Sequence, residues 1–246
     1  MVIGSNKIFI PDLTSTNTFS SAFVKTGPPP EGLIIYTNYQ TAGRGQKGSG
    51  WESEDGKNLL FSAILYPKMI SPSDQFILSK FVSLAVYDFL TEYTPDIHIK
   101  WPNDIYAGSD KIAGILIENS IMDGKIESTV VGIGLNVNQT VFKSGAPNPV
   151  SLSLLTGKTY ELPECMDKLS VFLDKRYDQL LNKKQSVLDF DYQSKLYRKD
   201  QWCMYKDNDK TFEGKIISVA GSGLLQIEDR DGSVHEYSFK EVSFMP

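Results

Sequence analysis

The sequence predicts an α/β (α+β) protein in which helices pack on a β-sheet, followed by a small C-terminal β-barrel. Strand-like and helix-like stretches alternate through the first two-thirds of the chain. One of the helical stretches, residues 73–93, has an apolar face wide enough to be covered by a sheet. From about residue 200 the pattern changes to short strands separated by glycine-containing turns, which is typical of a small barrel.

The expected strands of the first part are short and apolar. Asp123 and Gly124 predict a hairpin turn between the last two of them. In chain order, these strands cover residues 8–10, 33–39, 59–66, 97–101, 112–118 and 129–137.

The first expected helix begins at Ser15, Thr16 and Asn17, polar residues that are suited to cap a helix. It runs toward Lys25. Gly27 and the three prolines after it end the helix.

The helix at 73–93 gives the strongest periodic signal. Leu78, Val82, Ala85 and Phe89 fall on one stripe, with further apolar residues beside it. We therefore expect this helix to be buried against the sheet. Two further helices are expected at 163–183 and 186–198.

The C-terminal part contains three expected strands, at 211–218, 223–229 and 234–239, which glycine-containing turns separate. We place a domain boundary near residue 200. The sequence thus predicts a larger domain of residues 1–199 and a small β-barrel of residues 200–246.

Composition excludes several classes of protein. Of the 246 residues, 41% are hydrophobic and 22% charged, which indicates a folded globular chain. Its 25 Lys and Arg against 30 Asp and Glu give a net charge of −5, so no general basic surface for nucleic acid is expected. Two cysteines and two histidines, far apart, predict neither a disulfide framework nor a zinc site. With no signal peptide or membrane span in the sequence, we expect a soluble, cytoplasmic protein.

A glycine-rich loop at 43–48 has the spacing G-x-G-x-x-G. A dinucleotide-binding loop of this pattern opens a helix, whereas a further strand is expected after this one. A phosphate-binding P-loop is excluded because Ser49, not lysine, follows the last glycine. What remains is a loop that carries Arg44 and Lys47, either facing an anion or lying on a solvated surface hairpin.

Three other segments are candidates for a site, and each has a structural alternative. Residues 100–104, Lys-Trp-Pro-Asn-Asp, bring charged groups, an aromatic ring and an amide together within five positions. They form either part of a site or an ordinary turn. Lys111 stands at the mouth of an apolar strand, facing either an anion or water. Gly132 and Gly134, inside another apolar strand, mark either a close ligand approach or a bulge.

Catalysis by a nucleophilic side chain is poorly supported. His98 and His235 are the only histidines and fall in different expected domains, so no Ser-His-Asp or Cys-His set is indicated. Any reaction would depend on positioning two substrates and offsetting negative charge, which fits phosphate-ester or adenylate chemistry. The alternative is a non-catalytic module that binds a small anion.

Taken together, six segments resemble the biotin protein ligase family. The resemblance spans residues 8–138 by motif and the whole chain more loosely. It implies a mixed β-sheet packed by helices, as in class II synthetases, with a short C-terminal barrel. The segments are 15–17, 40–45, Trp51, 100–104, 111–116 and 132–136.

The resemblance implies a biotin–[biotin carboxyl-carrier protein] ligase. Such an enzyme activates biotin with MgATP to biotinyl-5′-AMP and transfers biotin to one lysine of a carrier domain of a biotin-dependent carboxylase. Mg²⁺ would arrive with ATP, no protein metal site or membrane partner is implied, and the family allows a homodimer. Lipoate or octanoate ligase, which shares the fold family, is the nearest alternative.

The roles of individual residues follow from the same resemblance. Arg44 and Lys111 would hold the biotin carboxylate and the α-phosphate from opposite sides, and Asp104 would lie near the acceptor amine; these three are the expected catalytic residues. Biotin would contact Ser15, Thr16, Asn17, Gln40, Gly43, Arg44, Gly45, Gln46, Lys111, Gly114 and Gly132, and ATP would contact Arg44, Lys47, Trp51, Lys100, Asn103, Lys111 and Asn136.

The sequence departs from the family pattern in two places. Many members carry a second arginine where this chain has Gln46, so we expect an active enzyme whose adenylate escapes more readily. Some members also carry an N-terminal helix-turn-helix domain. Because the first expected strand begins by residue 8, we predict that the chain does not bind DNA.

Overall fold

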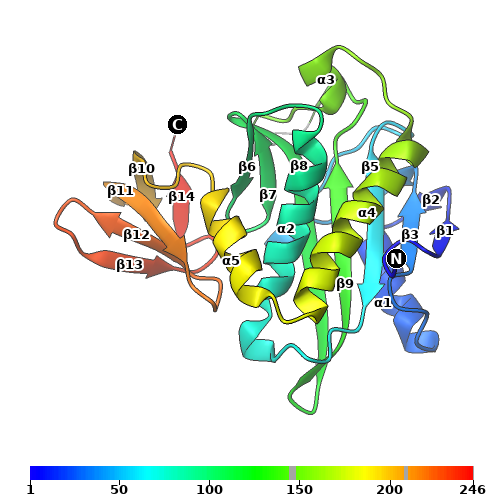
Figure 1. Ribbon diagram of the computed structural model, residues 1–246. Helices are drawn as coiled ribbons and strands as arrows, with labels where there is room; N and C mark the ends of the chain where they lie inside the picture. Colours follow the sequence, from blue (N-terminus) through cyan, green and yellow to red (C-terminus); the bar gives the residue numbers. More distant parts are fainter. Residues whose placement is uncertain (144–147, 208–209, 246) are drawn as a thin grey trace.

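The computed structural model describes residues 1–143, 148–207 and 210–245, apart from the side chain of Lys47. Its larger part is built on a seven-stranded sheet (Figure 1). The first pair, β1 with β3, is parallel and the other pairs are antiparallel, so the sheet is mixed as predicted. Across the sheet the strands are β1 (Lys7–Phe9), β3 (Ile34–Thr37), β5 (Leu59–Leu65), β9 (Lys125–Leu135), β8 (Asp110–Met122), β7 (Asp104–Ala107) and β6 (Ile97–Lys100).

Helices cover both faces of this sheet. Neighbouring residues of β3 and β5 point to opposite faces, so Ile34 joins the main core while Ile35 joins a smaller cluster. The smaller cluster packs under α1 (Thr16–Thr26), and the main core packs under α2 (Phe76–Thr91), α4 (Leu162–Leu181) and α5 (Gln185–Ser194). Figure 1 shows these last three helices side by side across one face. Within the described residues, no helix has both the length and the apolar character needed to cross a membrane.

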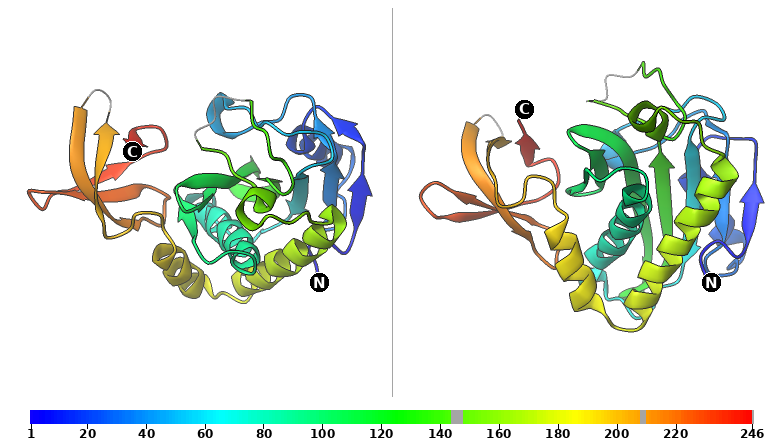
Figure 2. Two further views of the ribbon diagram at one scale, coloured as in Figure 1. Left: turned by 90° about the horizontal axis from the view of Figure 1, so that it is seen from above. Right: turned by 45° about the horizontal axis from the view of Figure 1, so that its top comes forward.

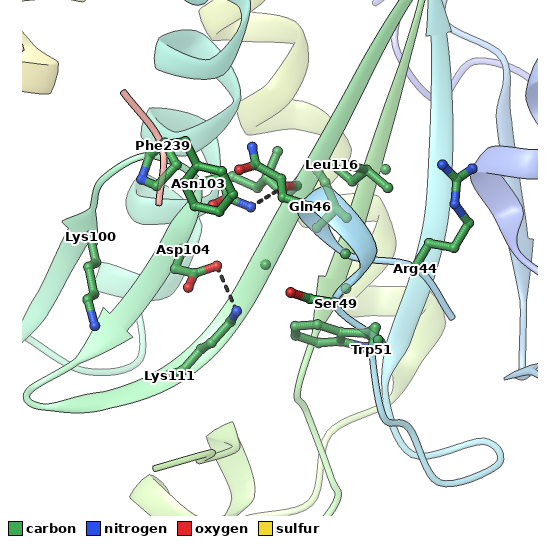
Figure 3. A pocket seen from close by; sticks show the side chains of 18 of the residues that line it. Arg44, Gln46, Ser49, Trp51, Lys100, Asn103, Asp104, Lys111, Leu116 and Phe239 are labelled. Atoms are coloured by element: carbon green, nitrogen blue, oxygen red, sulfur yellow. Dashed lines mark hydrogen bonds and ion pairs between the residues drawn. The ribbon is translucent and has the colours of Figure 1, made fainter. Parts of the chain in front are cut away.

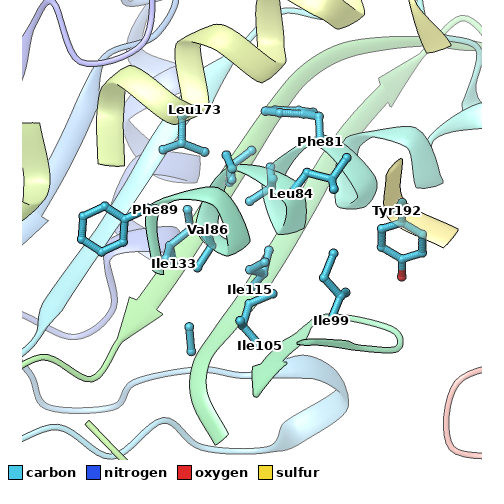
Figure 4. Packing of buried hydrophobic residues seen from close by; sticks show 14 of the residues in the cluster. Phe81, Leu84, Val86, Phe89, Ile99, Ile105, Ile115, Ile133, Leu173 and Tyr192 are labelled. Carbon is cyan, nitrogen blue, oxygen red and sulfur yellow. The ribbon is translucent and has the colours of Figure 1, made fainter. Parts of the chain in front are cut away.

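Helix α2 is the centre of the main core. Leu78, Val82, Ala85 and Phe89, the predicted stripe, are all 0% exposed. Figure 4 shows the α2 side chains with isoleucines of the sheet below them, Leu173 of α4 above them and Tyr192 of α5 to one side. Burial of large apolar side chains contributes roughly 1.5–3 kcal/mol each, so this helix fixes the sheet on which the site is built. The labelled members are Phe81, Leu84, Val86, Phe89, Ile99, Ile105, Ile115, Ile133, Leu173 and Tyr192.

An arginine ties the three covering helices together. Arg176 of α4 donates from Nε to Asp88 of α2 at 2.7 Å and from Nη1 to Asp191 of α5 at 2.6 Å, and its side chain is only 12% exposed.

Replacing Arg176 with methionine leaves both carboxylates without their counter-ion. We expect a loss of about 2–3 kcal/mol in the free energy of unfolding, reduced from the cost of a fully buried pair by partial exposure. Urea denaturation measures this loss. Arg230→Met, which removes the exposed pair with Glu213, is the control and should shift the midpoint much less.

The C-terminal part is a separate five-stranded antiparallel sheet, in the order β13-β12-β11-β10-β14. Figure 2 shows it beside the end of α5, away from the seven-stranded sheet. Among the described residues β13 and β14 do not pair, so the expected small β-domain is an open sheet and not a closed barrel. The boundary at residue 200 stays a prediction. The strands are β10 (Trp202–Asp207), β11 (Lys210–Val219), β12 (Leu225–Asp229), β13 (Val234–Tyr237) and β14 (Val242–Phe244).

Specific contacts dock the small sheet. The indole Nε1 of Trp101 donates to the carbonyl of Gly223 at 2.9 Å. The side chain of Gln193 on α5 donates to the Val219 carbonyl and accepts from its N–H. These contacts bring the segment that ends in β14 to the turn between β6 and β7, where the candidate site lies.

Several short elements were not predicted. Strand β7 follows β6 after a turn that contains the cis Trp101–Pro102 bond, and its four residues carry no alternating pattern. Strands β10 and β14 and helix α3 (Leu152–Thr156) were also missed, because three to six residues are too few for a periodic signal. The second of the two expected later helices ends at Ser194, four residues before its predicted end. The other expected strands and helices are confirmed, with shifted ends.

Candidate active site

A cavity of about 570 Å³ opens where several elements meet. Its wall combines the start of α1, the loop after β4 (Tyr39–Gln40), the β6–β7 turn, the first half of β8, the end of β9, and the C-terminal segment before and within β14 (Figure 3). The predicted residues that line it are Ser15, Thr16, Asn17, Gln40, Arg44, Gly45, Gln46, Trp51, Lys100, Asn103, Asp104, Lys111, Gly114 and Gly132.

One end of the cavity is cationic. Lys111 Nζ lies 2.7 Å from Asp104 Oδ1, and both side chains are about three-quarters buried. The ammonium also lies 5.7 Å from the centre of a Trp51 ring. Pairing of β7 with β8 brings Asp104 and Lys111 together, so Lys111 is not a strand-edge lysine in water. Figure 3 shows this pair at the floor of the cavity.

Lys100 lies near this end and is held by aromatic side chains. Its Nζ donates to the hydroxyl of Tyr106 at 2.8 Å and lies 5.0 Å from the Phe244 ring of the small sheet. Burial lowers the pKa of Lys100. Burial also raises the pKa of Tyr106, so the hydroxyl stays protonated.

The opposite end of the cavity is lined by polar residues that are almost fully buried. Ser15, Thr16 and Asn17 are 3–4% exposed. Gln40 Oε1 accepts from the Thr16 backbone N–H at 2.8 Å, and Ser62 Oγ lies 2.7 Å from Asn17 Oδ1. Ser15 takes the N-cap position of α1, but within the described residues its side chain makes no capping bond. These groups form a hydrogen-bonding surface for an uncharged polar ligand.

The glycine-rich loop folds back on itself as a hairpin around the 3₁₀ turn η1 (Gln46–Gly48), held by hydrogen bonds within the loop. The N–H of Gly45 donates to Ser49 at 2.7 Å, and the N–H of Trp51 donates to Gly43 at 3.0 Å. Arg44 donates to Glu118 on β8 at 2.7 Å. Figure 3 shows the guanidinium pointing away from Asp104 and Lys111, so a meeting of Arg44 with Lys111 on one ligand requires the loop to move and stays a prediction.

The glycines of β8 and β9 that line the cavity lie directly against side chains of the protein. A Cβ at Gly132 would lie 2.1 Å from Asn17 Oδ1, and a Cβ at Gly114 would lie 2.8 Å from Trp51 Cζ3. At Gly134 it would lie 2.4 Å from Trp51 Cε2. Asn17 and Trp51 therefore need glycine at these positions, and the contacts of Gly114 and Gly132 with biotin stay a prediction. Local glycine spacing could not distinguish a side chain from a ligand as the close neighbour.

Two of the predicted contacts lie outside this lining. Asn136 is buried away from the cavity lining, because its amide donates to the Val150 carbonyl at 3.0 Å. Gly43 is also outside the lining, since it closes the hairpin against Trp51. The side chain of Lys47 lies outside the described residues. In the part of the chain that the structure describes, no three His, Cys, Asp or Glu side chains gather to hold a metal ion.

Comparison with known proteins supplies the family. The model of the biotin/lipoate A/B protein ligase family matches residues 9–136, about half of the chain. The chain belongs to this family. The ligase is 27% identical to the bifunctional ligase/repressor BirA of Bacillus subtilis over 96% of this chain and 74% of that protein. It is 30% identical to the biotin–[acetyl-CoA-carboxylase] ligase of Paracoccus denitrificans over 64% of this chain and 68% of that protein.

Solved structures agree with this assignment. The biotin protein ligase of Aquifex aeolicus, in complex with biotin and ATP, matches 98% of this chain and 99% of its own with a TM-score of 0.80 and 26% identity. The resemblance to biotin protein ligases, the fold class and the prediction of a ligase enzyme are therefore confirmed.

Proposed function

We propose that this ligase activates biotin with MgATP to biotinyl-5′-AMP, releasing pyrophosphate, and transfers biotin to one lysine of a carrier domain. The observation that supports this best is a single cavity with an uncharged polar end and a cationic end. Biotin has the matching shape, a bicyclic urea that donates and accepts hydrogen bonds and a tail that ends in a carboxylate. Two of the proteins named above are a biotin–[acetyl-CoA-carboxylase] ligase and a biotin protein ligase.

The first step joins two anions. An oxygen of the biotin carboxylate attacks the α-phosphorus of ATP, and the bond to pyrophosphate breaks. Lys111 would offset the charge that repels the carboxylate from the phosphates and that builds at the α-phosphate. Arg44 would join it after leaving Glu118. A preorganised donor of this kind lowers the barrier by about 3–4 kcal/mol.

The second step needs a neutral acceptor amine. The amine attacks the carbonyl of the mixed anhydride, forms the amide and expels AMP. Asp104 lies beside Lys111 at the cavity floor, where its second carboxylate oxygen would orient the amine or accept its proton. Closure of the loop before this step would keep water from hydrolysing the anhydride.

Several finer points remain part of the proposal. Mg²⁺ would enter with ATP as part of that substrate and not as a resident metal. The carrier domain is the expected protein partner. Cytoplasmic location, a homodimer and the lack of DNA binding stay predictions.

The test is exchange of labelled pyrophosphate into ATP with biotin, lipoate or octanoate as the acid. A site that hydrogen-bonds a polar head rejects an analogue that lacks it by about 10⁴-fold, and the lipoyl ring has no urea to satisfy Thr16 and Gln40. We expect labelled pyrophosphate to enter ATP when the acid is biotin, and not when it is lipoate or octanoate. Equal exchange with lipoate would favour the lipoate ligase alternative, and no exchange with any acid would favour the anion-binding module.

The packing of Trp51 on Gly134 gives a further prediction. Gly134→Ala forces the indole to move, because the new Cβ would lie 2.4 Å from Cε2. A shift of about 1 Å at a reacting site reduces rates strongly, so we expect kcat/KM for ATP in the exchange assay to fall at least about tenfold. Gly221→Ala is the control, because its Cβ would meet open space. Unchanged kcat/KM in Gly134→Ala would show that Trp51 does not border the reacting groups.

A further inference from the structure

The carboxylate of Glu118 joins Arg44 of the glycine-rich loop to Asn17 at the polar end of the site. Its Oε1 accepts from Arg44 Nη2 at 2.7 Å, and its Oε2 accepts from Asn17 Nδ2 at 3.0 Å. Glu118 lies on β8, outside the lining of the cavity, and faces a second hollow beside it. The charge of Arg44 is thus held at the margin of the site although Arg44 belongs to the loop over it.

Asn17 continues this connection into the polar end. Its Oδ1 lies 2.7 Å from Ser62 Oγ, and Ser62 Oγ lies 2.8 Å from Thr16 Oγ1. Thr16 in turn contacts Gln40. An unbroken path of hydrogen bonds therefore runs from the residues expected to hold the biotin head to the guanidinium of Arg44.

The ion pair between Arg44 and Glu118 is weak enough for Arg44 to leave Glu118 when a better partner binds. The side chain of Arg44 is 48% exposed and that of Glu118 is 32% exposed. Pairs with this exposure contribute only about 0–1 kcal/mol. The biotinyl adenylate presents an acyl carbonyl oxygen and a phosphate side by side. Together these two groups offer a planar guanidinium stronger contacts than one carboxylate does.

We propose that Glu118 is a positioning residue that holds the Arg44 guanidinium away from Asp104 and Lys111 and gives it up when the adenylate forms. The inference depends on the proposed function, because the ligand that takes Arg44 from Glu118 is the biotinyl adenylate. Glu118 competes with the adenylate for Arg44. Retention of the adenylate is therefore weaker than Arg44 alone would give.

A double-mutant cycle tests this. Pre-formed labelled adenylate is bound to the wild type, Glu118→Gln, Arg44→Ala and the double variant, and its release is followed. We expect release from Glu118→Gln to be about three- to fivefold slower than from the wild type, which is the range that a partly exposed ion pair supports. In the Arg44→Ala background the same change should have no effect. The maximal rate of biotin-dependent pyrophosphate exchange should not fall in Glu118→Gln, because Arg44 then reaches the substrates without first leaving a carboxylate.

Two further variants make the result decisive. Glu127→Gln on β9 removes an equal charge from an exposed carboxylate bonded to Ser120, and release should not change. Should Glu118→Gln fail to fold, Glu118→Asp, which withdraws the carboxylate by one methylene, must show the same Arg44-dependent slowing. Unchanged or faster release, or a slowing that persists without Arg44, overturns the role of Glu118. If the wild type makes no adenylate, the proposed function fails first.

Discussion

Lys111→Met is expected to lower the maximal rate of biotin-dependent pyrophosphate exchange by about 10²–10³-fold, the effect of removing a preorganised charge stabiliser. Lys111 supplies a fixed positive charge at the cavity floor, where Asp104 holds its ammonium at 2.7 Å. Because the lysine is already in place before substrates bind, its loss should reduce kcat more than it raises KM. Exchange of labelled pyrophosphate at saturating biotin and ATP measures the effect.

The matched control for this variant is Lys125→Met. Lys125 is exposed at the start of β9, far along the strand from the cavity, and the same substitution there should leave exchange unchanged. Circular dichroism should show that both variants fold. Should Lys111→Met keep more than a third of the wild-type rate, the charge at this position would not stabilise the transition state.

Arg44→Ala is expected to reduce the same exchange by about 10²-fold and to shorten retention of the adenylate, because a planar donor to carboxylate and phosphate is lost. The structure also predicts what should not change. Since the pair with Glu118 is partly exposed, the free energy of unfolding should fall by less than about 1 kcal/mol. Activity and stability should therefore separate in this variant.

Arg44→Lys distinguishes charge from shape. Lysine restores the charge but presents one compact ammonium in place of a planar fork, so we expect only partial recovery of exchange and of adenylate retention. Wild-type retention in Arg44→Ala would contradict the role assigned to the loop. Equal loss of stability and activity would show that Arg44 is needed for folding and not for catalysis.

The elements with a strong periodic signal were predictable from sequence. The face of α2 that carries Leu78 and Phe89 is fully buried, as its spacing requires. Strand β7, four residues long and placed by a turn, and β14, three residues long, have too little pattern to be recognised locally. The docking of the small sheet on Trp101 through Gly223 joins residues 122 positions apart, which no local pattern contains.

The site was predictable where one short segment carries the chemistry. Asp104 and Lys111 belong to motifs that sequence alone singled out, and pairing of β7 with β8 brings them together. Glu118 was missed because it is one carboxylate within the long strand β8, and its partner Arg44 lies 74 residues away. Phe244 of the wall was missed for the same reason, since only the docked C-terminal sheet brings it to Lys100.

Covalent labelling of a carrier domain is the most direct test of the whole account. The ligase is mixed with labelled biotin, MgATP and the apo form of a biotin carboxyl carrier domain, beside a carrier whose acceptor lysine is replaced by arginine. We predict one biotinyl group on the first carrier, dependent on ATP and on Lys111, and none on the second. No covalent label, or equal label on both carriers, would contradict the assignment of this cavity to biotin transfer.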